Sequence, residues 1–211
     1  MDKLELSRSI SRKLLQIKAI RFNFDDLYLW ASGLKSPVYC DNRLSLSYSS
    51  VRSMIRDGYV NRIQTEFPDA EVIAGVATGA IAQGALVADQ LNLPFVYVRE
   101  KAKDHGMMKL IEGIVHPGQK TVIVEDLVST GGSSLKAADE LRKAGVNVLG
   151  MTAIFTYGFP EAINRFKENN CELHTLVTFS TLMEVAFEEG YITEEEVKKL
   201  VEWHQNPQSY M

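Results

Sequence analysis

Residues 121–134 carry the side chains of this sequence that are best suited to chemistry. Two acidic residues, Glu125 and Asp126, follow an apolar run, and a segment of hydroxyl and glycine residues, 129–134, comes next. Closely spaced backbone N–H groups can approach an anion where glycine has no side chain, and the N-terminus of a following helix favours the same charge. The segment therefore suits an anion that lies beside two carboxylates.

The magnitudes of these interactions favour a sugar phosphate as the ligand. A helix dipole contributes only ~0.3 to 1 kcal/mol, whereas each hydrogen bond to a charged group contributes ~1.5 to 3 kcal/mol, so several loop donors must converge on the anion. Glu125 and Asp126 would repel a phosphate and suit neutral hydroxyls or a divalent cation instead. The alternative is an ordinary turn before a helix cap, but the ordered succession of strand, acids, small loop and helix favours a binding site.

Two other phosphate-binding motifs are excluded by their spacing. The sequence contains no Gly-x4-Gly-Lys-Ser/Thr and no Gly-x-Gly-x-x-Gly. A nucleoside triphosphate loop and a dinucleotide-binding fold are therefore disfavoured.

A parallel sheet is expected to position the acid pair. From residue 72 onward, short apolar runs alternate with helical stretches, which is typical of βαβ units with both faces of the sheet covered. The expected strands are 72–76, 95–98, 121–124, 146–156 and 173–179. The expected helices are 80–91, 133–143 and one that begins at Pro160. Ligands of open parallel sheets bind beyond the carboxyl ends of the strands, where the acid pair is expected.

The regions on either side of this core are expected to form a cap and terminal helices. A small hairpin or two short strands are indicated at 27–31 and 38–40. Apolar residues spaced by three or four predict an N-terminal helix and a second helix before Pro68; these residues are Leu6, Ile10, Leu14, Ile17, Val51, Ile55, Tyr59 and Ile63. Near the end, Thr193 and Glu196 predict a capping box, and the apolar face of the helix that follows is Val197, Leu200 and Val201.

The whole chain, 1–211, is expected to be a single α/β domain. Its N-terminal helix and cap span 1–69, the core spans 70–180 and the C-terminal helices span 181–211. At 211 residues, the length suits one core with a small appendage.

Composition narrows the choice of partner and compartment. The formal net charge of −4 and a pI of about 5.6 disfavour a nucleic-acid or membrane-surface partner. No uncharged apolar run is long enough to span a membrane, and the charged start of the chain is unlike a signal peptide, so a cytoplasmic protein is expected. Cys40 and Cys171 are far apart and form no CxxC pair, so we expect reduced thiols.

Residues 121–133 resemble, over their whole length, the 13-residue signature with which type I phosphoribosyltransferases bind phosphoribosyl pyrophosphate (PRPP). The resemblance implies the fold of that family, a central parallel sheet flanked by helices with a small N-terminal cap or hood. It also implies that Glu125 and Asp126 hold the ribose hydroxyls and that the small loop holds the 5-phosphate. The residues that it assigns to PRPP in the remainder of the signature are Leu127, Val128, Ser129, Thr130, Gly131, Gly132 and Ser133.

A second segment, 99–109, resembles the mobile catalytic loop of the orotate phosphoribosyltransferases. Alone, its composition would suit a solvated surface loop, but its cations also suit a diphosphate leaving group. The resemblance assigns Arg99, Lys103 and His105 to PRPP and gives Lys103, His105 and Asp126 catalytic roles. It implies a homodimer in which this loop reaches the neighbouring subunit's site, and Mg²⁺ held mainly by PRPP rather than directly by protein ligands.

A third segment, 31–43, is similar to the orotate-side cap of the same family, and Ser129 is expected to contact orotate. The sequence departs from many relatives by lacking a basic residue at Ala31, Thr78 and Tyr157. The resemblance implies transfer of the phosphoribosyl group from PRPP to orotate. A purine phosphoribosyltransferase and a PRPP-sensing regulator on the same fold are the alternatives, and the acidic pI argues against the regulator.

Overall fold

The fold is built around a six-stranded sheet with the order β10-β9-β8-β5-β6-β7. This computed structural model describes residues 2–30, 33–100 and 110–210. Every neighbouring pair of strands is parallel except β6 and β7. The strands are β5 (Val72–Val76), β6 (Phe95–Val98), β7 (Ile111–Glu112), β8 (Lys120–Val128), β9 (Asn147–Thr156) and β10 (Leu173–Thr178).

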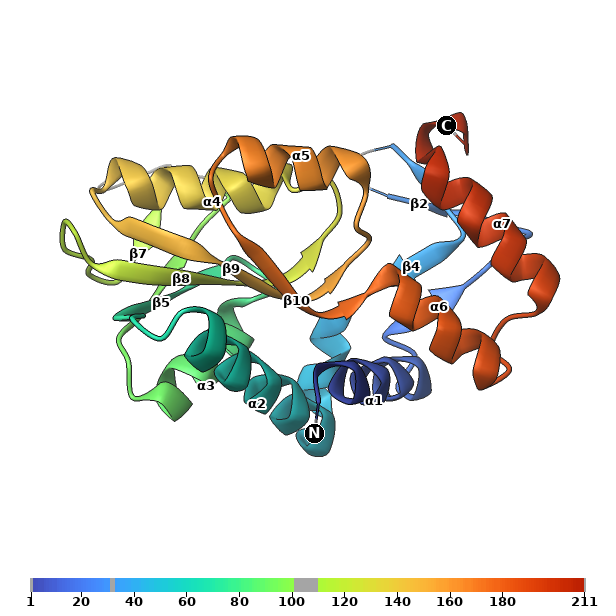
Figure 1. The fold of residues 1–211 in the computed structure, drawn as a ribbon, viewed down its shortest axis with the longest axis horizontal. Coiled ribbons are helices and arrows are strands. Elements are labelled where there is room, and N and C mark those ends of the chain that lie inside the picture. The colour runs from blue at the N-terminus through green and yellow to red at the C-terminus, as the bar shows by residue number, and fades with distance from the viewer. Residues whose placement is uncertain (1, 31–32, 101–109, 211) are drawn as a thin grey trace.

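Helices cover both faces of the sheet. In Figure 1, α4 (Gly132–Lys143) and α5 (Pro160–Glu168) lie on one face. The opposite face carries α1 (Lys3–Gln16), α2 (Ser49–Glu66) and α3 (Ile81–Leu91). All five residues of β5 are buried, as expected for a central strand that contacts helices on both sides.

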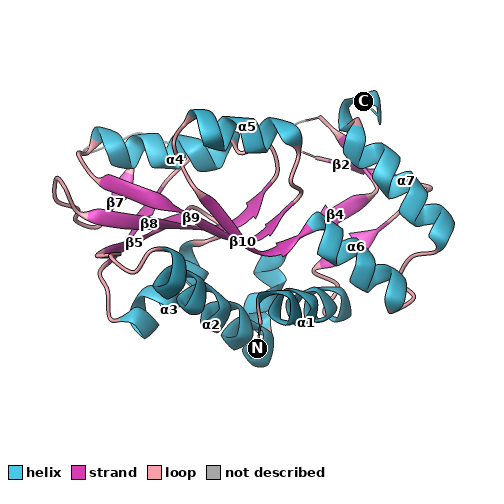
Figure 2. Cartoon of the chain, in the orientation of Figure 1, coloured by secondary structure: helices cyan, strands magenta, loops and turns pink. Residues whose placement is uncertain are grey.

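Short strands form the cap, and two C-terminal helices lie beside it (Figure 2). Strand β1 (Ile20–Phe22) pairs with β4 (Val38–Cys40), and β2 (Tyr28–Leu29) pairs with β3 (Lys35–Ser36). The remaining elements are the 3-10 helix η1 (Asn42–Ser47), α6 (Phe179–Glu188), α7 (Glu194–Gln205) and η2 (Pro207–Tyr210).

An aromatic cluster joins the cap to the carboxyl end of the sheet. Tyr157 follows β9, is 1% exposed, and its ring centroid lies 4.8 Å from that of Trp30 and 5.9 Å from that of Trp203. The indole N–H of Trp203 donates to the carbonyl oxygen of Lys35 at 3.0 Å. Nε2 of His204 lies 2.6 Å from the carbonyl oxygen of Tyr157. The C-terminal helix is therefore fixed to both the cap and the core.

One group of buried side chains extends from Ile10 through the sheet to Trp203, and a second group packs α4 and α5 against the same sheet. This shared sheet supports our proposal that residues 1–211 form one domain. In the described ranges, no helix has the length and apolar character needed to cross a bilayer.

The predicted core elements are confirmed except at two strand ends, Phe179 and the acid pair, of which the second is the more informative. The strand expected at 121–124 continues as β8 through Glu125 and Asp126 to Val128. Hydrogen-bond pairing with β9 continues to Val128, so the parallel ladder overrides the low strand preference of two acids.

The predictions for the flanking regions are correct for the helices and partly wrong for the strands. The two cap strands do not pair with each other, since β4 pairs with β1, which was not predicted. Phe179 begins α6 rather than ending a strand. The Thr193 and Glu196 capping box is present. Val201, expected on the apolar face of the last helix, is 39% exposed, and Trp203, which was not predicted, is buried in the core.

The side chain of Tyr59 connects α2 to the acid pair. Its hydroxyl is buried and donates to the carbonyl oxygen of Glu125. Tyr59→Phe should lower the free energy of unfolding by about 1 kcal/mol, because a buried hydrogen bond is lost without loss of the ring. Urea unfolding measures this change. The exposed Tyr191→Phe is the control, and an unchanged Tyr59→Phe protein would show that the bond contributes nothing.

Candidate active site

The acid pair lies in a buried part of β8, an interior strand, toward the carboxyl end of the sheet that faces the cap. Glu125 is only 4% exposed, and its carboxylate accepts from the Ser134 hydroxyl at 2.8 Å and from the Asp126 backbone N–H at 3.0 Å. Burial and the neighbouring Asp126 charge raise the pKa of Glu125 well above its usual range. Glu125 is therefore fixed in place by its hydrogen bonds.

Asp126 is held between the turn 76–79, which follows β5, and the cap. A Cβ atom on Gly79 would overlap the Asp126 carboxylate, so only glycine lets this backbone come so close. The side-chain amide of Asn42 donates to the carbonyl oxygen of Asp126 at 2.7 Å. Burial raises the pKa of Asp126 above its usual value, although hydrogen bonds and the charge of Arg43 act in the opposite direction.

The loop after β8 presents backbone donors at the start of α4. Gly131 has a φ of +80°, which places it in the left-handed region, and it is the N-cap of α4. No side chain that the structure describes caps this helix end, so its first N–H groups can bind an anion. A Cβ on Gly131 would lie 2.8 Å from the ring of Phe166, so packing against α5 also requires glycine here.

A cavity of about 350 Å³ joins the acid pair to this loop and to residues 76–79. Its lining includes the predicted site residues Arg99, Glu125, Asp126, Leu127, Ser129 and Ser133. The residues that sequence reasoning missed are Gly79, Lys136 and Glu140. Along α4, Lys136 follows Ser133 by three residues and Glu140 follows Lys136 by four. Helical periodicity counted from the loop could therefore have identified Lys136 and Glu140 from the sequence.

Four predicted PRPP residues are absent from the lining of this cavity. The side chain of Val128 is buried in the core, and its carbonyl oxygen accepts from Thr156 and Tyr157. Thr130, Gly131 and Gly132 form the turn into α4. They would bind a phosphate through backbone N–H groups or, for Thr130, a hydroxyl. Lys103 and His105 lie outside the described residues.

Arg99 directly follows the last residue of β6, and it lines the cavity. Its backbone N–H donates to the carbonyl oxygen of Leu110 at 2.8 Å, and its Nη1 lies 3.5 Å from Oε1 of Glu112. Nη1 is buried and has no hydrogen-bond partner among the residues that the structure describes. This guanidinium therefore retains donor capacity for an anion.

The positions that lack the basic residues of many relatives differ in their surroundings. Thr78 lines the cavity, in a turn whose Ala77–Thr78 peptide bond is cis. Tyr157 is buried among aromatic rings, and Ala31 lies outside the described residues. Arg43, a nearby cation of the cap, makes a bidentate ion pair with Asp41 at 2.7 and 3.0 Å.

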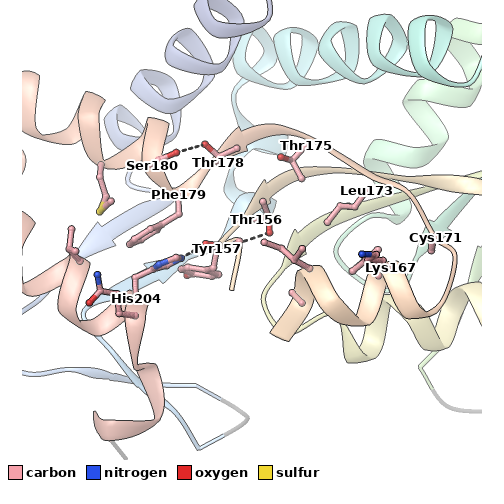
Figure 3. Close-up of a pocket in the computed structure, with 17 residues that line it drawn as sticks. Thr156, Tyr157, Lys167, Cys171, Leu173, Thr175, Thr178, Phe179, Ser180 and His204 are labelled. Atoms are coloured by element: carbon pink, nitrogen blue, oxygen red, sulfur yellow. Dashed lines mark hydrogen bonds between the residues drawn. The ribbon is translucent and has the colours of Figure 1, made fainter. Parts of the chain in front are cut away.

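A second, larger cavity lies between α5 and the helices α6 and α7. It measures about 650 Å³, and Figure 3 shows Tyr157, Phe179 and His204 on one side of it, with Lys167, Cys171 and Leu173 on the other. No carboxylate is among its described lining residues, and its walls are mostly apolar. Size alone would favour this cavity, but the acid pair and the phosphate loop assign the chemistry to the smaller one.

Comparison with known proteins agrees with this geometry. The phosphoribosyl transferase domain family matches residues 48–171. The orotate phosphoribosyltransferase of Cytophaga hutchinsonii is 49% identical over 97% of this chain and 98% of its own length. That of Bacteroides fragilis is 52% identical over 96% of this chain and 95% of its own length.

A solved structure extends the similarity to three dimensions. The orotate phosphoribosyltransferase from Aeropyrum pernix superposes with a TM-score of 0.76 and 27% identity, over 87% of this chain and 99% of its own. The sequence relatives and this fold lead to the same conclusion. This chain belongs to the phosphoribosyl transferase domain family and, within it, to the orotate phosphoribosyltransferases.

Proposed function

We propose that this chain transfers the 5-phosphoribosyl group of PRPP to orotate, giving orotidine 5′-monophosphate and diphosphate in de novo pyrimidine biosynthesis. The observation that carries the proposal is the meeting, in one cavity, of a buried acid pair, a helix N-terminus without a side-chain cap, and the turn 76–79. The cavity thus offers acceptors for ribose hydroxyls and donors for phosphate oxygens. Its relatives of about 50% identity support orotate as the acceptor.

In the proposed reaction, a bond forms between N1 of orotate and C1 of ribose while the bond from C1 to the diphosphate oxygen breaks. Orotate can supply its N1 lone pair as an anion, so no strong protein base is required. Asp126 and Glu125 would accept hydrogen bonds from the ribose hydroxyls and hold C1 in place as positive charge develops there. We also propose that Ser129, which lines the cavity, contacts orotate.

The chief electrostatic demand is the charge that builds on the departing diphosphate. Arg99 lines the cavity, and its Nη1 makes no hydrogen bond to a described residue, which supports its role there. We propose that Lys103 and His105 add further donors. Hydrogen bonds to charged groups contribute ~1.5 to 3 kcal/mol each, so the three together would make a large contribution to the transition state.

We propose that Mg²⁺ accompanies PRPP. In the described ranges, no group of three or more His, Cys, Asp or Glu side chains could hold a metal ion. Asp126 and Glu125 could therefore supply only part of a coordination shell, and substrate oxygens would supply the rest. When bound, the ion would neutralise developing charge on the diphosphate.

We further propose a cytoplasmic homodimer. The resemblance of segment 99–109 to a loop shared between subunits supports the dimer. The cytoplasm is supported by the free thiols of Cys40 and Cys171, which suit a reducing compartment.

Purified wild-type protein with PRPP, Mg²⁺ and orotate should release orotidine 5′-monophosphate, measured as the loss of orotate absorbance. Hypoxanthine, guanine and adenine serve as parallel acceptors. Turnover of a purine without turnover of orotate would favour a purine transferase. PRPP binding without turnover of any acceptor would favour a PRPP-sensing protein.

Gly79→Ala should reduce turnover by about 100-fold or more, because a Cβ at this position displaces the Asp126 carboxylate. Gly58→Ala is the matched control, since the three atoms nearest its Cβ would be methyl groups of leucine side chains, the closest at 3.2 Å. Steady-state kinetics on both variants measures the effect. Normal turnover by Gly79→Ala would mean that the position of Asp126 does not matter to the reaction.

Glu125→Gln should become more stable relative to the wild type as pH rises above 4.5, the ordinary pKa of this side chain. Below that pH, both the folded and the unfolded wild type hold the proton. Above it, Glu125 ionises in the unfolded chain but stays protonated in the folded chain up to its raised pKa. The wild type therefore loses stability as pH rises, and Glu125→Gln does not. Urea unfolding from pH 4 to 8 measures the difference, and a pH-independent difference would contradict the raised pKa.

A further inference from the structure

Among the residues that the structure describes, the charged side chains that line the reaction cavity are unfavourable for a polyanionic substrate. Even with Glu125 protonated, as its raised pKa implies, three further acidic residues, Glu100, Asp126 and Glu140, line it against the two cations Arg99 and Lys136. The turn 76–79 contributes the neutral Thr78. PRPP carries phosphate groups at both ends, so each cation that faces the cavity has a large effect on binding.

Lys136 lies on the cavity side of α4. Ser133, Lys136, Ala137 and Glu140 all line the cavity, and their spacing of 3, 4 and 7 residues from Ser133 places them along one stripe of the helix. The stripe begins at the phosphate loop. Lys136, one turn further along, donates from Nζ to the carbonyl oxygen of Glu100 at 3.2 Å, beside Arg99. Lys136 therefore faces the Arg99 side of the cavity.

The charge of Lys136 is not neutralised by its helix neighbour. A lysine and a glutamate four positions apart commonly pair on a helix surface. Here Oε1 of Glu140 instead accepts from Nζ of Lys143 at 2.7 Å. In the ranges that the structure describes, Nζ of Lys136 makes no ion pair. An ammonium group has three donors, and one hydrogen bond to Glu100 leaves two for a ligand.

We propose that Lys136 is a further substrate-binding residue, which contacts the diphosphate of PRPP together with Arg99. This inference rests on the proposed function and deepens it. Lys136 supplies, from α4, a positive charge that the neutral Thr78 turn does not supply. A purely structural alternative is that Lys136 only tethers the backbone of Glu100.

Three substitutions separate these roles. Lys136→Ala removes both the charge and the donor, Lys136→Gln keeps a hydrogen-bond donor without charge, and Lys136→Arg keeps both. Lys198→Ala is the control, because Lys198 is an exposed lysine on α7 that pairs with Glu194. Calorimetry with the intact protein and Mg²⁺ gives the Kd of PRPP, of inorganic diphosphate and of ribose 5-phosphate, and the melting temperature checks that each variant folds.

Lys136→Ala and Lys136→Gln should raise the Kd of PRPP and of diphosphate about tenfold and leave that of ribose 5-phosphate unchanged. Lys136→Arg and Lys198→Ala should remain within about threefold of the wild type. The inference is overturned if Lys136→Gln binds diphosphate like the wild type, or if ribose 5-phosphate is weakened equally. If the wild type binds no PRPP, the proposed function is overturned as well. If the wild type turns over normally and Lys136→Gln binds PRPP and diphosphate as tightly as the wild type, only the role of Lys136 is overturned.

Discussion

The site depends on keeping two adjacent carboxyl groups buried in the central strand of the sheet. Burying a charge is costly unless hydrogen bonds or a raised pKa compensate. The protein uses both, since Glu125 is held by Ser134 and by the Asp126 backbone, and the pKa of each carboxyl group is raised. The acids are thereby fixed before any substrate arrives, and no reorganisation is needed at the moment of reaction.

Several elements are constrained by this requirement. Tyr59 of α2 reaches the backbone of Glu125, Asn42 of η1 reaches that of Asp126, and Gly79 leaves room for the Asp126 carboxylate. Residues far apart in the sequence thus contact two consecutive peptide units. The cap and the core are joined at the same point, so the geometry of the acid pair depends on both.

Sequence reasoning identified the acid pair, the phosphate loop and the parallel sheet because these depend on local composition and periodicity. It missed the length of β8, since the pairing of β9 with Glu125 is a tertiary effect that strand preference does not contain. It also missed Gly79 and Lys136, which enter the cavity only when separate elements pack together. The pairing of β4 with β1 was missed because three-residue strands carry almost no periodic signal.

The chain contains two tryptophans, and both lie where the cap meets the core. Trp30 comes from the cap and Trp203 from the last long helix, and their ring centroids are 6.0 Å apart, beside Tyr157. The intrinsic fluorescence of the protein therefore originates almost entirely from this junction. Without any added label, its emission would report optically on the docking of the cap.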